Sequence, residues 1–404
     1  MRVLHFSDTL LGKTETFVQA RLVGERFQPV AATWDHVEGG LAIPCPFVVL
    51  DRYLVRSPER GMRRLLRGMT RVVARKAEIV RVLMSSRPDV VHAHFGTIGA
   101  TVSPFCHRLG IPLVVSYYGF DLASAAAPSL RRAYQRMFSH RHTVFTAEGP
   151  ALARRLVEIG ASPDTVRLLP LSLPAWALEA TAPRPARQPG SLRLLQVARF
   201  VEKKGVDLSL AAVERARRRG VDVTLTLAGD GPLGPGLSAM TRDLGLADAV
   251  RFLGYVSHDA LPDLLAGVDA LIQPSRVAAN GDTEGGHPTV LIEALAREIP
   301  IVGTRHADIP FVVSDGQNGL LADENDAVGL AAALVRLATE PQLLETLATQ
   351  ARRRILRRHH PATLLLLRER IYREAMRRHP ERASRWISQK LPFTDPFSPS
   401  AEQK

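Results

Sequence analysis

The chain has 404 residues and a formal net charge of +13, from 53 basic and 40 acidic side chains. That length is too great for one ordinary hydrophobic core, so two domains are expected. No stretch approaches the roughly 20 apolar residues that would span a bilayer, and the N-terminal sequence lacks the apolar run of a secretory leader. We therefore expect a cytoplasmic protein, soluble or peripheral on the inner face of the cytoplasmic membrane, in which Cys45 and Cys106 are reduced thiols.

The excess of basic side chains points to an acidic partner, and nucleic acid, anionic lipid or a phosphorylated substrate all fit it. Aromatic residues make up only 6% of the chain and no nucleic-acid-binding motif is present, so nucleic acid is disfavoured. The segment from Arg52 to Arg87 carries eleven Lys or Arg and two Glu, interleaved with apolar residues. It predicts a basic amphipathic helix. One use of such a helix is docking to an anionic membrane surface; the alternative is an ordinary solvated face.

The first part of the chain alternates between short apolar strands and helical patterns, which is typical of a parallel sheet covered on both faces. The predicted strands are residues 2–6, 27–34, 46–50, 89–94, 112–117, 143–146 and 166–169. The predicted helices lie near residues 17–22, 52–87, 99–109, 130–138 and 151–159. Five prolines between Pro170 and Gly190 then interrupt the alternation and indicate a linker.

After the linker the alternation restarts. Strands are predicted at 192–197, 223–228, 250–253, 270–273, 299–302 and 319–321, with helices between them and further helices near 327–338, 341–357 and 362–376. The predicted fold is α/β, with two tandem Rossmann-like doubly wound domains facing across a cleft. Their predicted bounds are 1–172 and 191–360, with a linker at 173–190, a C-terminal helix at 361–380 that packs back toward the first domain, and a polar tail at 381–404.

The stretch from Gly281 to Arg297 combines a loop of small and acidic residues with the start of an apolar helix. Pro288 suits a first helical turn, because its φ is fixed and it has no N–H to leave unpaired. Glu284 lies just before this helix start and Glu293 lies in its second turn. Free N–H groups at a helix N-terminus suit a phosphate, and carboxylates suit hydroxyls, so the stretch predicts a nucleotide-sugar site. The alternative is that Glu284 only caps the helix and Glu293 is solvated.

Other polar groups also follow predicted strands, where ligands bind in such sheets. Arg199 and Lys204, after the first strand of the second domain, could converge on one diphosphate. Taken alone, they are better read as two solvated loop cations. After the third strand, exposed backbone at Gly254 and Tyr255 could pair with the edge of a base.

The sequence resembles the GT-B glycosyltransferases, specifically the large retaining family four that includes bacterial polysaccharide and phosphatidylinositol mannosyltransferases. The resemblance extends to Arg378 and is strongest in the second domain. The matching strings there are ARFVEKKG at 198–205, AGDGPL at 228–233, FLGYV at 252–256, EGGHPTVLIEA at 284–294, GTRHADIPFVV at 303–313 and QNGLLADENDAVGLAAAL at 317–334. In the first domain, LGKTETFV at 11–18 and VHAHFG at 91–96 resemble the colanic-acid-type exopolysaccharide subgroup.

The resemblance assigns roles to the matching positions. Arg199 and Lys204 would neutralise the donor diphosphate, Glu293 would hold the ribose hydroxyls, and Glu284 would contact the transferred sugar. Backbone around the helix start would cradle sugar and phosphate, and backbone after the third strand would face the base; these positions are Gly286, His287, Pro288, Thr289 and Val290, and Gly254 and Tyr255. On the acceptor side, the residues near the reaction centre would be Gly12, His94, Tyr118 and Asp121.

Two features depart from the family's pattern. Eight residues separate Glu284 from Glu293 where the family usually has seven, so the loop holds one extra residue. The family also commonly has a His-Gly-x-Asp turn whose His touches the donor sugar, and this chain has Tyr118-Gly119-Phe120-Asp121. A Tyr hydroxyl donates and accepts hydrogen bonds but gains no charge near neutral pH. Either Tyr118 or His94 substitutes as the hydrogen-bond partner, or activity is altered.

The implied reaction is transfer of a hexose from a UDP-sugar or GDP-sugar to a hydroxyl of a saccharide or polyprenyl-linked saccharide, with retention, in cell-surface polysaccharide biosynthesis. No Asp-x-Asp string follows a predicted strand, so we expect no cofactor and no required metal. The alternative, prompted by Tyr118, is a catalytically weak or inactive family member that acts as a membrane-docked partner in a polysaccharide assembly complex. A sugar-nucleotide epimerase of the same fold is disfavoured by the two charged strings that contain Arg199 and Glu284.

Overall fold

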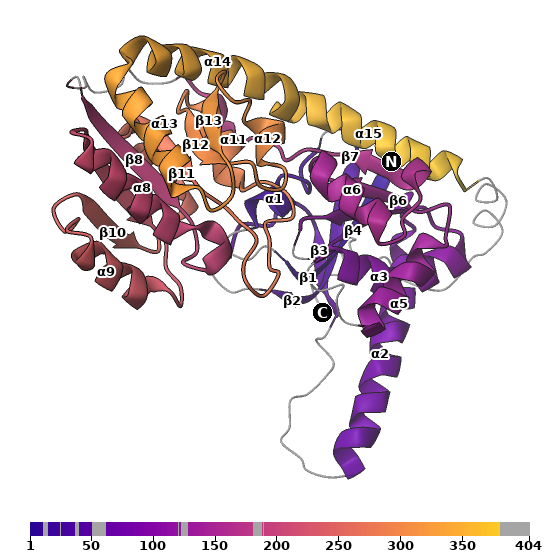
Figure 1. The fold of residues 1–404 in the computed structure, drawn as a ribbon. Helices are drawn as coiled ribbons and strands as arrows, with labels where there is room; N and C mark the ends of the chain where they lie inside the picture. Colours follow the sequence, from indigo (N-terminus) through magenta and orange to yellow (C-terminus); the bar gives the residue numbers. More distant parts are fainter. Residues whose placement is uncertain are drawn as a thin grey trace. The chain divides into compact units, whose positions relative to one another are not determined.

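The computed structural model of the chain describes residues 1–10, 15–24, 26–36, 40–50, 62–119, 121–122, 128–180, 188 and 190–379, and the side chains of residues 10 and 62–72 are not described. The chain forms two compact units (Figure 1). Unit 1 comprises Met1–Ala147, Ala153–Leu169 and Leu365–Lys404, and unit 2 comprises Glu148–Leu152 and Pro170–Leu364. The predicted site residue Gly12, positions 52–61 of the predicted basic helix and the predicted tail all lie outside the described residues.

Unit 1 is built on a sheet of seven parallel strands in the order β3-β2-β1-β4-β5-β6-β7. The strands are β1 (Arg2–Leu10), β2 (Gln28–His36), β3 (Phe47–Val49), β4 (Val90–His94), β5 (Leu113–Tyr117), β6 (Val144–Ala147) and β7 (Val166–Leu168). All seven predicted strands are confirmed, but β1 is longer than predicted. The polar residues Ser7 and Thr9 continue the pairing of β1 with β2, opposite Thr33 and Asp35. The change from apolar to polar residues after residue 6 was therefore a wrong indicator of the end of the strand.

Helices pack against this sheet. They are α1 (Thr16–Gln19), α2 (Met62–Ser86), α3 (Gly96–Leu109), α5 (Pro128–Phe138), α6 (Pro150–Glu158) and α15 (Pro361–Arg377), with a 3-10 turn, η2, at Pro163–Thr165. The predicted basic helix is confirmed over its described part as α2, whose residues Ile79, Val82 and Leu83 are buried. Tyr372 of α15 packs in a core cluster with Val90 of β4, so this helix belongs to unit 1 from Leu365 onward.

Unit 2 holds a second parallel sheet, of six strands in the order β10-β9-β8-β11-β12-β13. The strands are β8 (Ser191–Val197), β9 (Asp222–Ala228), β10 (Val250–Gly254), β11 (Ala270–Gln273), β12 (Ile301–Thr304) and β13 (Gly319–Ala322). The helices are α7 (Ala175–Leu178), α8 (Val206–Arg218), α9 (Gly234–Asp243), α10 (Leu261–Ala266), α11 (Thr289–Ala296), α12 (Ile309–Val312), α13 (Ala327–Thr339) and α14 (Pro341–His359), with 3-10 turns η3 (Glu202–Lys204) and η4 (His258–Ala260). The predicted fold class, two doubly wound parallel sheets, is therefore confirmed.

The core of unit 2 explains this arrangement. Helices α8 and α13 pack together and share a core cluster with Leu192 and Leu194, alternate residues of β8. Helix α11 packs against β12 and α14 instead, and every residue from Val290 to Ala296 is buried. Strands β8 and β11 are neighbours within the sheet. Because parallel strands end at the same edge, the loops after β8 and β11 leave the sheet side by side.

The predicted linker is not irregular throughout. It contains α7, whose C-terminal carbonyls receive hydrogen bonds from two arginines. Arg352 Nη2 donates to Leu178 O at 2.7 Å and to Glu179 O at 2.9 Å, and Arg297 Nη1 donates to Glu179 O at 3.2 Å. Guanidinium groups satisfy the carbonyls that a helix end leaves open, so this part of the linker is fixed to unit 2.

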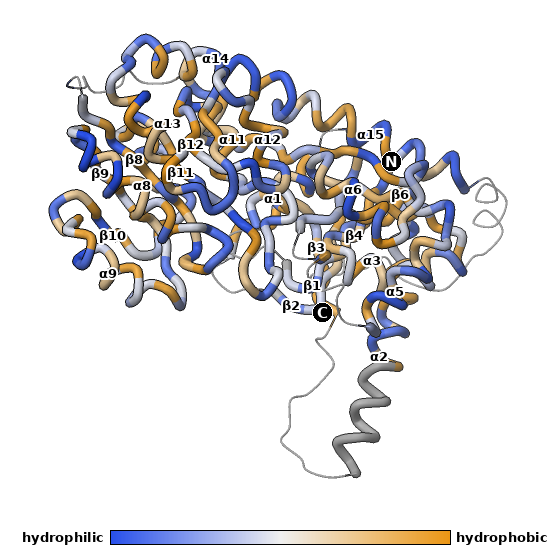
Figure 2. Tube along the Cα trace, in the orientation of Figure 1, coloured by the Kyte–Doolittle hydropathy of each residue, from blue (hydrophilic) through white to orange (hydrophobic). Residues whose placement is uncertain are grey.

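Within the described residues, no single helix is long and apolar enough to be a membrane span. Taken together, α13 and the stretch Pro341–Arg377 have the length and composition of a span, but the chain bends by 101° between them. Hydrophilic and hydrophobic residues alternate along α14 and α15 (Figure 2).

Candidate active site

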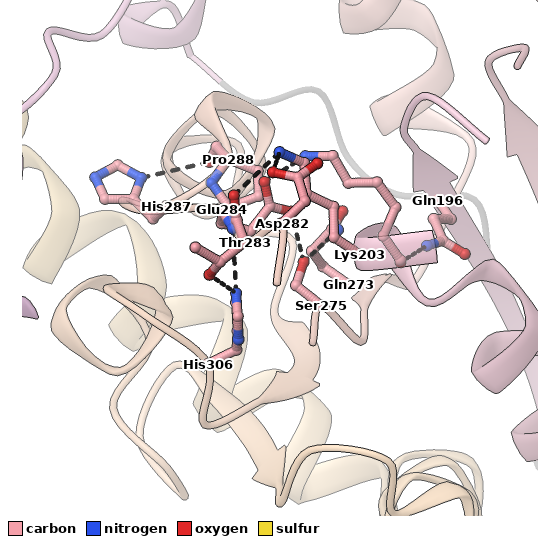
Figure 3. A network of polar contacts seen from close by, with 11 residues as sticks. Gln196, Lys203, Gln273, Ser275, Asp282, Thr283, Glu284, His287, Pro288 and His306 are labelled. Atoms are coloured by element: carbon pink, nitrogen blue, oxygen red, sulfur yellow. Dashed lines mark hydrogen bonds and ion pairs between the residues drawn. The ribbon is translucent and has the colours of Figure 1, made fainter. Parts of the chain in front are cut away.

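Charged and polar side chains of unit 2 gather in the two loops that follow β8 and β11 (Figure 3). The first loop carries Arg199 and η3, and the second runs from Ser275 through Glu284 to the start of α11. The sequence predicted a site at this edge because ligands of such sheets bind beyond the carboxyl ends of the strands. The side chains of the two loops contact one another directly.

Lys204 and Glu284 form an ion pair, with 2.7 Å between Lys204 Nζ and Glu284 Oε2. The Lys204 side chain is 15% exposed and that of Glu284 is 7% exposed. Ser275 Oγ donates to the other carboxylate oxygen at 2.7 Å. Burial alone raises the pKa of Glu284, but the Lys204 ammonium and these hydrogen bonds outweigh it and hold that pKa below its ordinary value. Glu284 is therefore ionised near neutral pH.

Lys203, which the sequence analysis did not single out, ties the same two loops together. Its ammonium donates to Asp282 Oδ1 and to Thr283 O, both at 3.0 Å. The close approach of the loops depends on Gly205, whose φ is +61° and where a Cβ would lie 2.0 Å from Pro274 O. A side chain at this position would force the loops apart.

His306 fixes the backbone of the acidic loop. Its Nε2 accepts a hydrogen bond from the Thr283 hydroxyl at 3.0 Å and from the Glu284 N–H at 3.3 Å. Its Nδ1 lies 2.7 Å from Glu324 Oε1. Since Nε2 accepts, the ring proton is on Nδ1 and is donated to Glu324. The 1% exposed imidazole thus holds Glu284 in position.

Arg199 differs from the two lysines. Its side chain is exposed, and it makes no side-chain hydrogen bond or ion pair with the described residues. A guanidinium that is not engaged in the fold is available for a bidentate contact with a phosphate.

The helix start that the sequence singled out begins one residue later than predicted. Pro288 is the N-cap residue of α11, with φ −60° and ψ 136°, and no capping side-chain hydrogen bond is found among the described residues. The alternative that Glu284 serves as the cap is therefore wrong. In the loop before the helix, Gly285 adopts a φ of +77°, a conformation that glycine tolerates.

Glu293 is 3% exposed, so the alternative that it is a solvated surface residue is also wrong. Its Oε1 lies 2.8 Å from Nε2 of His258 in η4. The hydrogen bond to Glu293 raises the pKa of His258, against the opposing effect of burial. Trp176 lies edge-on to the imidazole, with 5.7 Å between ring centroids. The residue predicted to hold a ribose is thus occupied by a histidine that the sequence analysis missed.

Three other predicted donor positions have their own local environments. The His287 ring is 5% exposed and packs edge-on against His359, with 5.7 Å between centroids, and Figure 3 shows it turned away from Lys203 and Ser275. Burial lowers the pKa of His287 to about 4, so the ring is neutral. Gly254 has a φ of +69° and its carbonyl accepts a hydrogen bond from Gly229 N at 2.7 Å, while Tyr255 is 58% exposed.

In unit 1, the two residues offered as alternative hydrogen-bond partners bind each other. His94 Nδ1 and the Tyr118 hydroxyl are 2.8 Å apart. Asp121 is fully buried and accepts hydrogen bonds from Gly96 N at 3.1 Å and from Tyr118 N at 2.9 Å. Burial raises the pKa of Asp121 to about 7. Asp121 therefore fixes the backbone of the Tyr118 turn.

His94 belongs to a buried histidine cluster. His5, His92 and His94 have potential metal-ligand atoms within 4.8 Å of one another. Five of the six ring nitrogens have hydrogen-bond partners, and only His5 Nε2 lacks one among the described residues. The contacts are His5–His94 at 3.0 Å, His94–Tyr118 at 2.8 Å, and His92–Tyr372 and His92–Ser116 at 2.7 Å each. Burial, and then the nearby guanidiniums of Arg21 and Arg368, lower the pKa of His94 to about 3. A cation there would break these bonds beside two positive charges, so the cluster fits a hydrogen-bond network better than a metal site.

Comparison with known proteins gives two family matches. Residues 179–354 match the family "Glycosyl transferases group 1", and residues 38–172 match "Glycosyltransferase Family 4". A protein that carries the name colanic acid biosynthesis glycosyltransferase WcaL, from Salmonella typhimurium, is 30% identical over 273 residues, 66% of each chain. The amylovoran biosynthesis glycosyltransferase AmsK of Erwinia amylovora is 28% identical over 253 residues, 62% of this chain and 61% of that one. The matched regions span slightly under two thirds of these relatives.

Solved structures share the fold. HepE of Anabaena, in complex with UDP, has a TM-score of 0.72 at 17% identity over 92% of this chain and 99% of that chain. WaaG, a glycosyltransferase involved in lipopolysaccharide biosynthesis, has a TM-score of 0.62 at 16% identity over 90% of this chain and 99% of that chain.

Proposed function

Because the chain belongs to the GT-B glycosyltransferases of group 1 and family 4, we propose that it transfers a hexose from a nucleoside-diphosphate sugar to a hydroxyl of a saccharide or lipid-linked saccharide. The anomeric configuration is retained, and the product contributes to a cell-surface polysaccharide. The names of the relatives from Salmonella and Erwinia, which refer to colanic acid and amylovoran, support the last point.

The observation that carries this proposal is the part-buried Lys204–Glu284 pair, which joins the loop that carries the exposed Arg199 to the loop that leads into α11. An ammonium and a guanidinium suit the two phosphates of a donor. When the donor binds, its diphosphate competes with Glu284 for Lys204. The released carboxylate is then free to accept a hydrogen bond from a hydroxyl of the transferred sugar.

Glu293 undergoes a similar exchange of partners. A buried carboxylate needs a hydrogen-bond donor, and His258 supplies one at 2.8 Å. A ribose hydroxyl would supply it in the donor complex. The donor nucleotide therefore replaces two internal partners, one at each glutamate.

The chemistry needs a stabilised leaving group. The bond between the anomeric carbon and the diphosphate oxygen breaks, a bond to the acceptor oxygen forms on the same face, and the acceptor proton passes to the departing phosphate. Positive groups that are fixed before the reaction stabilise the charge that develops on the diphosphate. Arg199, Lys204 and the N-terminus of α11 would supply that stabilisation, and no protein nucleophile is required.

The experiment that tests the proposal is a melting-temperature screen with UDP, GDP, UDP-glucose and GDP-mannose. A nucleotide that binds the native state raises the melting temperature by mass action. UDP-glucose is included because HepE was crystallised with it, and GDP-mannose because one relative is a GDP-mannose-dependent mannosyltransferase of Mycolicibacterium smegmatis. Arg199→Ala should strongly reduce the shift at the same nucleotide concentration. Arg336→Ala, which removes an exposed cation of α13, should keep it. No shift with any nucleotide would contradict the proposal.

A further inference from the structure

Unit 1 contains a cavity that the proposed donor chemistry does not use. It has a volume of about 540 Å³, within the range of small-molecule sites. It lies between α2 and α3, beside the carboxyl ends of β1 and β2, which contribute Asp8 and Trp34.

The cavity is apolar inside and cationic at its mouth. Its walls include Trp34, which is 6% exposed, Ile79, which is 1% exposed, and the half-buried Phe105. Three exposed basic side chains also line it, which are Arg75 and Lys76 of α2 and Arg108 of α3. One exposed carboxylate, Asp8, opposes them, so the lining carries a net positive charge.

These features together select one class of ligand. A hydrocarbon chain would displace water from the apolar walls, and a phosphate would pair with the basic residues at the mouth. A free saccharide offers no group for those cations, and a neutral lipid offers none either. Inorganic phosphate alone would leave the apolar walls in contact with water.

We propose that this cavity binds a hydrocarbon-bearing phosphate or diphosphate, and that it holds the lipid end of the acceptor. That the bound lipid is the acceptor rests on the proposed function, which supplies the transfer reaction. It selects a lipid-linked acceptor over a free saccharide. The ligand chemistry itself rests only on the cavity.

Binding can be measured without any donor, by isothermal titration of the purified full-length protein with decyl phosphate. The matched controls are decanol, which lacks the charge, and inorganic phosphate, which lacks the chain. We expect decyl phosphate to bind at least about ten-fold more tightly than either control, because only it satisfies both parts of the site. Equal binding of decanol or of inorganic phosphate would overturn the proposal.

Two kinds of variant test whether the ligand binds in the cavity. Lys76→Ala combined with Arg108→Ala should weaken decyl phosphate binding by roughly ten-fold or more, since each removes a charge-assisted contact. Arg131→Ala with Arg132→Ala, which removes two exposed cations of α5 outside the cavity, should leave binding unchanged. Ala100→Phe, which places a large side chain in the lining, should also abolish binding, while circular dichroism reports whether the fold is kept.

A separate arm distinguishes an acceptor lipid from a membrane surface. Sedimentation with vesicles that contain an anionic phospholipid is compared for the wild type and for the Lys76 and Arg108 double variant. If the double variant loses vesicle binding and the wild type does not bind soluble decyl phosphate, the cations serve a membrane surface and the proposal is wrong. Because none of these assays contains a nucleotide, failure to bind any donor would overturn the proposed function and leave this result intact.

Discussion

The ammonium of Lys204 lies 2.7 Å from the carboxylate of Glu284, so the cation expected to hold the donor diphosphate is paired with the carboxylate expected to contact the sugar. This pairing gives the site an ion pair with hydrogen bonds in place of two isolated, poorly solvated charges. It also means that donor binding exchanges one anionic partner of Lys204 for another.

Removing the charge of Lys204 should destabilise unit 2. In Lys204→Met, the buried Glu284 carboxylate loses its counter-ion, and the free energy of unfolding should fall by about 2–3 kcal/mol. Urea denaturation measures this change. Adding Glu284→Gln should recover part of the loss, because the second substitution removes the uncompensated charge. Strictly additive effects of the two substitutions would show that the pair is not coupled.

Arg199 should behave in the opposite way. Its exposed side chain makes no hydrogen bond or ion pair with the described residues, so Arg199→Ala should change the free energy of unfolding by less than about 0.5 kcal/mol. Turnover should nevertheless fall by roughly 10²–10³-fold, the usual effect of removing one group that stabilises developing charge. Denaturation and sugar transfer are measured on the same preparation. A variant that transfers sugar normally would remove Arg199 from the site.

The contact between His258 and Glu293 should make stability depend on pH. Since Glu293 raises the pKa of His258 above the ordinary value of 6.5, the stabilisation is fully present below pH 6.5 and is lost as the pH rises through the higher folded-state value. The stability difference between the wild type and His258→Ala should therefore be largest at the acidic end, at about 1 kcal/mol in the free energy of unfolding. Melting temperatures of both proteins, measured from pH 5.5 to 9, report this difference. A difference that is constant over this range would contradict the ion pair.

The same contact should oppose nucleotide binding. A ribose hydroxyl must displace His258 from Glu293, so the donor nucleotide should bind His258→Ala more tightly than wild type, and the advantage should shrink as the pH rises and His258 loses its charge. Titration calorimetry at pH 6 and pH 8.5 provides the comparison. Trp176→Phe, which alters the ring packed against His258 but keeps Glu293 paired, serves as the control. Weaker binding by His258→Ala would place His258 among the residues that hold the nucleotide.

Tyr118 allows a test between the enzyme and the inactive partner. Tyr118→Phe removes the hydroxyl that binds His94 and should reduce the free energy of unfolding by about 1–2 kcal/mol, because the buried imidazole loses a partner. The proposed enzyme should transfer sugar with Tyr118 in place, and Tyr118→His should give no large gain. Negligible activity in the wild type, raised by Tyr118→His, would support the alternative of an inactive partner protein.

Much of the fold was predictable because it depends on local pattern. Apolar runs separated by helical periodicity located every strand of both sheets. The extension of β1 was not predictable, since Ser7 and Thr9 are polar and their place in the strand depends on pairing with β2. Helix α7 was hidden among prolines, and the arginines that bind its end come from positions more than 100 residues away in the sequence.

The candidate site was predictable only where it follows a strand end. Arg199, Lys204, Glu284 and Glu293 stood out for that reason, but the two histidines that contact the glutamates did not. His306 and His258 reach the two glutamates from 22 and 35 residues away, and no local spacing reports such a contact. His94 and Tyr118 are joined because β4 and β5 are neighbours that end at the same edge, a relationship that needs the sheet order.

We propose that the loops after β8 and β11 bind the diphosphate of a sugar nucleotide. Titration calorimetry of UDP and GDP against the wild type, Arg199→Ala and Arg336→Ala measures this binding. We expect one nucleotide to bind the wild type and Arg336→Ala equally, and to bind Arg199→Ala on the order of 100-fold more weakly. Equal affinity of all three proteins for that nucleotide, or no binding of either nucleotide to the wild type, would contradict it.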